Sequence, residues 1–155
     1  MKRIVSLKIK FLFLYCLLFA VYCFISSCKK KDQPTNVPKI EFVSISPSSA
    51  VEYVNAITIT VSYDDLDGDV GQNDPNVSNL FITDSRNSVM YNYRISQLAP
   101  DGANVHIKGN LNVVIKSTAI TDNSSSQSVT YSVYLKDRAG NESNTVSTSA
   151  ITVTK

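Results

Sequence analysis

Apolar residues recur at every second position through most of the chain after residue 39, and over no helical length do they recur at spacings of three and four. In residues 57–63, isoleucine, valine and tyrosine alternate with threonine and serine. A strand with this pattern buries one face and leaves the other in water, as the strands of a two-sheet sandwich do. We therefore predict an all-β fold.

Turn-forming residues separate the alternating segments, and residues 109–110 form either a turn or a bulge within one long strand. The resulting seven to nine strands fit an immunoglobulin-like antiparallel β-sandwich. The chain has no tryptophan, and no cysteine follows Cys28, so this sandwich would be held by packing alone. The predicted strands occupy residues 40–46, 57–63, 80–84, 89–95, 105–107, 111–115, 129–136 and 146–153.

The first 27 residues differ from the rest of the chain in charge. They hold 4 of the 15 basic residues and none of the 13 acidic ones, so 11 bases against 13 acids remain and the formal net charge changes from +2 to −2. The remainder lacks the basic surface that nucleic-acid binding needs, and we expect no nucleic-acid partner. Residues 11–25 are uncharged and apolar; as a helix they would span about 22 Å, less than the ~30 Å hydrocarbon core. This length favours a signal peptide over a membrane span.

The segment Ile25-Ser26-Ser27-Cys28 resembles the lipobox of bacterial lipoproteins. That resemblance implies cleavage before Cys28 and acylation of its thiol, palmitate included, with an uncleaved anchor as the alternative. We therefore divide the chain into a signal peptide (1–27), a lipidated cysteine with a flexible tether (28–39) and the sandwich domain (40–155). Because Lys29 stands where an aspartate would resemble an inner-membrane retention signal, we expect an outer-membrane location, facing either the periplasm or the surface.

Five carboxylates crowd into the eleven positions 64–74, at Asp64, Asp65, Asp67, Asp69 and Asp74. Such crowding is unfavourable unless solvent or a cation relieves it. In an extended loop the alternate positions 65, 67 and 69 project to one side, and hard oxygen ligands favour Ca²⁺ over zinc. The segment is not an EF-hand, because a valine occupies the glycine position of that loop and an asparagine its bidentate glutamate.

A second loop would contribute to the same site. In an immunoglobulin-like sandwich, residues 64–78 and 137–144 would be the B–C and F–G loops, which lie at one end of the fold. Arg138 would then be an alternative, internal counterion. The opposing interpretation is a solvated acidic loop whose aspartates accept hydrogen bonds from their own backbone amides. The candidate Ca²⁺ ligands are Asp65, Asp67, Asp69, Asp74 and Asp137.

Residues 65–71 and 135–146 look like the corresponding segments of small lipoproteins of Gram-negative bacteria to which no activity is assigned. The turn at 137–141 also resembles that of bacterial immunoglobulin-like modules. The resemblance implies an immunoglobulin-like domain in the cell envelope and no particular activity.

No motif in the chain predicts catalysis. His106 is the only histidine, and its apolar neighbours predict that it points outward. We therefore expect a non-catalytic binding or structural module with an unknown protein or glycan partner. The alternative is a carbohydrate-capture module that uses Tyr134 and Tyr53 if both lie exposed on one face, and a more distant one is a hydrolase with two loop carboxylates.

Overall fold

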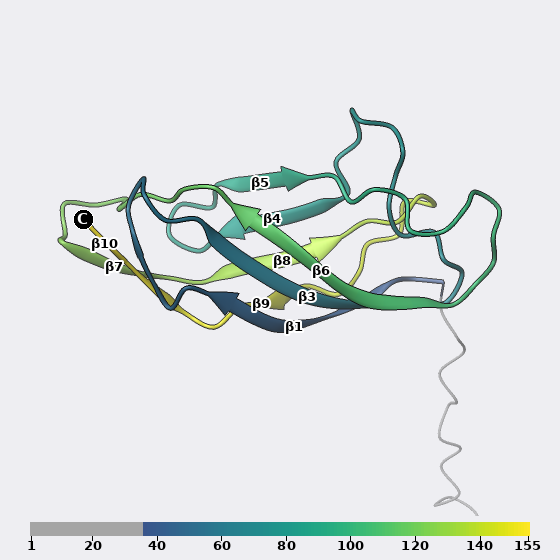
Figure 1. The fold of residues 1–155 in the computed structure, drawn as a ribbon, viewed down its shortest axis with the longest axis horizontal. Coiled ribbons are helices and arrows are strands. Elements are labelled where there is room, and N and C mark those ends of the chain that lie inside the picture. The colour runs from purple at the N-terminus through teal and green to yellow at the C-terminus, as the bar shows by residue number, and fades with distance from the viewer. Residues whose placement is uncertain (1–35) are drawn as a thin grey trace, which may run out of the picture. The chain divides into compact units, whose positions relative to one another are not determined.

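A computed structural model describes residues 36–155, which form ten strands (Figure 1). Within that range no helix has the length and hydropathy needed to cross a membrane. The predicted signal peptide, Cys28 and most of the tether lie outside the described residues. The strands are β1 (Lys39–Ser46), β2 (Ser49–Val51), β3 (Ile57–Asp65), β4 (Leu80–Asp84), β5 (Met90–Tyr93), β6 (Ile107–Ile115), β7 (Ser126–Val129), β8 (Tyr131–Leu135), β9 (Val146–Ser147) and β10 (Ile151–Thr154).

The strands form three sheets, in the orders β1-β3-β6, β5-β4-β8-β9 and β2-β10-β7. All pairings are antiparallel except that of β2 with β10, which is parallel. The strand count exceeds the predicted seven to nine because β2 was not predicted and because two predicted strands are interrupted. Thr130 separates β7 from β8, and three residues separate β9 from β10. The all-β class predicted from the alternation is confirmed.

One apolar core joins the inner faces of the three sheets. Ile57, Ile59 and Val61 of β3 are fully buried, and so are Tyr131 and Val133 of β8, as the alternation predicted. The prediction was wrong for two valines that precede strands: Val89 is 45% exposed and Val105 is 46% exposed. Both precede the strands to which they were assigned, since β5 begins at Met90 and β6 at Ile107.

Residues 107–115 form the single strand β6 rather than two strands with a turn. Its pairing with β3 runs without a shift from Ile57 opposite Ile115 to Asp65 opposite Ile107. Gly109 lies opposite Tyr63, and a Cβ at this glycine would lie 3.0 Å from the tyrosine hydroxyl oxygen. The glycine is therefore explained by the aromatic ring beside it, not by a chain reversal.

The sheet pairing brings two loops to the same end of β4. Leu80, the first residue of β4, lies opposite Leu135, the last residue of β8. The loop that precedes β4 (residues 66–79) therefore ends beside the start of the loop that follows β8 (residues 136–145). This is the end of the domain at which the acidic segment lies.

Candidate functional site

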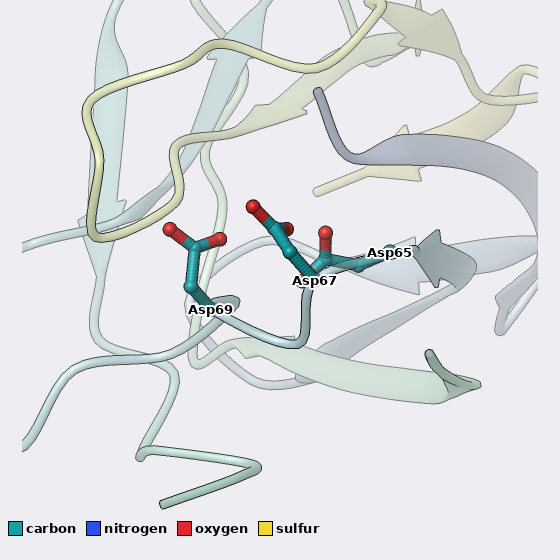
Figure 2. Close-up of side chains that lie close together, drawn as sticks. All are labelled: Asp65, Asp67 and Asp69. Carbon is teal, nitrogen blue, oxygen red and sulfur yellow. The ribbon is translucent and has the colours of Figure 1, made fainter. Parts of the chain in front are cut away.

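Three aspartates gather where β3 ends. The inward alternation of β3 continues through its last residue, so Asp65 points into the interior and is 0% exposed. Asp67 and Asp69 follow in the loop and are partly buried. One carboxylate oxygen from each of the three lies within 4.8 Å of the others (Figure 2).

The hydrogen bonds around these carboxylates are incomplete. Asp65 Oδ2 accepts a hydrogen bond from the Val70 amide at 3.0 Å, and Asp69 Oδ2 accepts one from the Ala139 amide at 3.1 Å. The other oxygen, Oδ1, is buried without a hydrogen-bond partner in Asp65, Asp67 and Asp69 alike. Buried polar atoms are nearly always paired, so three orphan oxygens in one cluster call for an explanation.

The pKa values of two of these groups reflect the crowding. Burial raises the pKa of Asp65 to about 6, and the neighbouring Asp67 and Asp69 carboxylates act in the same direction. Burial also raises the pKa of Asp69, to which the charges of Asp137 and Asp67 contribute. The ionised forms of these carboxylates are therefore unfavourable, because the groups are buried and close to one another.

Arg138 joins the loops around the cluster. Its backbone amide donates to the Asp69 carbonyl at 3.1 Å, and its Nε lies 3.5 Å from an Asp101 carboxylate oxygen. As an internal counterion Arg138 would pair with the aspartate cluster, but its guanidinium hydrogen bonds go to backbone carbonyls instead. Those carbonyls belong to Gly71 at 3.1 Å, Gly68 at 3.3 Å and Ala99 at 3.4 Å.

Two glycines fix the path of the acidic loop. Gly68 has a φ of 77° and Gly71 a φ of 94°, in the left-handed region that glycine tolerates best. A Cβ at Gly68 would overlap the Val105 carbonyl oxygen, and one at Gly71 would overlap the Ser96 carbonyl oxygen. The loop therefore lies against residues 96–105 too closely for any side chain at these positions.

Asp74 and Asp137 are not part of the three-carboxylate group. Asp74 Oδ1 accepts hydrogen bonds from the backbone amide and side-chain amide of Asn76, at 2.9 and 3.1 Å. Both oxygens of Asp137 accept from Asn141, at 2.7 and 2.8 Å. The amide-capping interpretation thus describes these two residues and also the Oδ2 atom of Asp65, whereas the carboxylates of Asp65, Asp67 and Asp69 are brought together.

The remaining predicted candidates lie elsewhere. His106 is exposed, as its neighbours predicted, and its Nε2 lies 2.8 Å from an Asp64 carboxylate oxygen. Tyr134 on β8 stacks on Phe81 of β4, with ring centroids 4.8 Å apart. Tyr53 is 73% exposed on the turn after β2. One ring face of Tyr134 is therefore covered by Phe81, a contact that the strand pattern did not identify.

Comparison of the chain with protein-family models, with curated proteins and with solved structures finds no match. The site is therefore interpreted from its own residues.

Proposed function

We propose that the chain is a lipid-anchored lipoprotein of the outer membrane whose domain is a non-catalytic, immunoglobulin-like binding or structural module. The sheet orders β1-β3-β6 and β5-β4-β8-β9 support the fold type, because they correspond to strands A-B-E and C′-C-F-G of such sandwiches. In this assignment, residues 66–79 join B to C and residues 136–145 join F to G.

The observation that carries the binding role is the clamp that Arg138 makes at this loop end. One side chain holds carbonyls of residues 68, 71 and 99, which come from two separate loops, while its own loop is a third. A surface that is ordered before it meets a partner loses little conformational entropy on binding. The three clamped loops are therefore the surface through which the module would contact a protein or glycan.

The anchor is supported by the order of basic residues, apolar run, small residues and cysteine in residues 1–28. Two lipid signals already give stable membrane attachment, and the lipobox implies several acyl chains on Cys28. The tether 29–39 would extend at most about 40 Å, which lets the domain stand clear of the headgroups.

The anchor is tested by expressing the full chain in a Gram-negative host fed a clickable palmitate analogue. We expect label and outer-membrane fractionation for the wild type and for Cys23→Ser, a matched control in the apolar run. Cys28→Ser should lose both. Label retained by Cys28→Ser, or fractionation of the wild type with the inner membrane, would contradict the proposal.

Carbohydrate capture is the second candidate, because Tyr134 and Phe81 place an aromatic pair on β8 and β4. A panel of envelope glycans probed with the full chain separates the two surfaces. Binding that Tyr134→Ala abolishes and Arg138→Gln leaves intact would assign the sugar site to the sheet. The opposite pattern would assign it to the loop end.

A further inference from the structure

The Asp65 carboxylate is a buried charge aimed at two further carboxylates. Asp65 is 0% exposed, and its Oδ1 has no hydrogen-bond partner. Figure 2 shows the three carboxylate groups on the same side of the chain, and their closest oxygens lie within 4.8 Å of one another. An unpartnered buried oxygen that faces like charges is strongly unfavourable unless something positive lies between them.

No cation among the described residues forms an ion pair with Asp65, Asp67 or Asp69, although the charge of nearby Arg138 acts to lower the pKa of Asp69. The guanidinium of Arg138 is occupied by three carbonyls and by Asp101. The backbone amides of Val70 and Ala139 satisfy only the Oδ2 atoms of Asp65 and Asp69. Protonation of Asp65 would remove one charge and leave two, so it relieves the crowding only in part.

The size and chemistry of the group select the cation. Three carboxylates offer only hard oxygen ligands, which exclude a preference for soft or thiolate-binding metals. Ca²⁺ binds oxygens at about 2.3–2.6 Å, so oxygens on opposite sides of the ion lie about 4.6–5.2 Å apart. Oxygens that all lie within 4.8 Å of one another fit inside that sphere. The preference for Ca²⁺ over Mg²⁺ follows from coordination chemistry, because Mg²⁺ requires a near-ideal octahedron and keeps several waters. We propose that Asp65, Asp67 and Asp69 together bind one Ca²⁺ ion.

The ion would connect two parts of the domain. Asp65 belongs to the end of β3, while Asp69 accepts hydrogen bonds from the Arg138 and Ala139 amides of the loop after β8. Bound Ca²⁺ would therefore fix the acidic loop to the sheet and to the second loop at once. This inference does not depend on the lipid anchor or on any partner of the proposed function.

Thermal unfolding of the full chain in nonionic detergent, followed by circular dichroism, tests the site. With millimolar Ca²⁺ we expect Tm to rise by roughly 5–15 °C above its value in chelator, because a ligand that binds only the native state stabilises it. Mg²⁺ at the same concentration should raise Tm much less. Titration calorimetry in parallel should give one ion per chain.

The variant Asp67→Asn/Asp69→Asn should lose the Ca²⁺ response, and Asp74→Asn is its matched control in the same loop. Both variants should unfold in chelator at or above the wild-type Tm, which shows that they fold. Equal wild-type Tm values in Ca²⁺ and chelator would overturn the proposal. So would an equal response to Mg²⁺, a response retained by the double variant, or one lost by Asp74→Asn.

Discussion

Two strands, β3 and β4, each end on a fully buried aspartate, and the surroundings of these two carboxylates differ. At the last residue of β4, Asp84 is 0% exposed and accepts three hydrogen bonds from Arg86, with the shortest N–O distance at 2.7 Å. Arg86 in turn donates to Thr118, Ala119 and Gln127. At the last residue of β3, Asp65 is equally buried but has an unpartnered oxygen and two carboxylate neighbours.

The difference separates a carboxylate that is neutralised by an ion pair within the fold from one that is not. Asp84 has its counterion, Arg86, two residues away, so its charge is neutralised within the fold, and Arg86 also ties the β4–β5 turn to residues 118, 119 and 127. Asp65 forms no ion pair with a cation among the described residues, and burial, together with the neighbouring carboxylates, raises its pKa to about 6. Perturbed, incompletely paired groups of this kind mark candidate functional sites.

The largest effect is expected from breaking the satisfied pair. Arg86→Met leaves Asp84 buried without its counterion, and such variants lose about 3–5 kcal/mol of unfolding free energy. Urea unfolding of the full chain should show this loss equally with and without Ca²⁺. A loss below about 1 kcal/mol would mean that the ion pair contributes little, and the contrast between Asp84 and Asp65 would fail.

Asp65→Asn should have an effect whose sign depends on Ca²⁺. In chelator the variant should match or exceed the wild type by about 1–3 kcal/mol, because a buried charge is removed while the amide oxygen can still accept from Val70. In Ca²⁺ it should fall below the wild type. Urea unfolding of both proteins in both buffers measures this change of sign. A variant that is less stable than the wild type in both buffers would show that Asp65 has only a structural role.

The pH dependence of the metal-free protein should follow the raised pKa values. Asp65 has a pKa of about 6 in the folded chain and 3.8 as its ordinary value, so between these pH values the folded state binds the extra proton. Its contribution to stability should therefore rise as the pH falls through about 6 toward 3.8, by at most about 1.4 kcal/mol per pH unit for one proton. Asp65→Asn should flatten this rise in a chelator-buffered pH series, and an unchanged slope would contradict the assignment.

The smallest effect is expected at the neighbouring residue. Asp64 points away from the core and makes an exposed pair with His106, and such pairs contribute about 0–1 kcal/mol. Asp64→Asn should change unfolding by less than about 0.5 kcal/mol and leave the Ca²⁺ response intact. A lost response would extend the ion site to the outer face of β3.

The alternation was enough to predict the fold class, the limits of β4 and the buried residues of β3 and β8. The same alternation places Asp65 on the buried face of β3 with Ile57, Ile59 and Val61, so the sequence also indicated a buried carboxylate. It could not separate Asp65, Asp67 and Asp69 from Asp74 and Asp137, because local Asx bonds to Asn76 and Asn141 occupy the latter two. The clamp of Arg138 onto residues 68, 71 and 99 depends on tertiary contacts that no local pattern encodes.

The side chain of Asn144 fixes the start of β1, where a force on the preceding chain would reach the domain. Its amide accepts from the Ile40 backbone amide at 2.9 Å and donates to the Ile40 carbonyl at 2.8 Å, where β1 begins. A pull on the chain before Lys39 would load the pairing of Lys39 with Asp64, next to Asp65, and then the two Ile40 bonds directly after it. Tension from an anchored tether would be delivered beside the acidic cluster, and an ion bound there would resist it where the load enters.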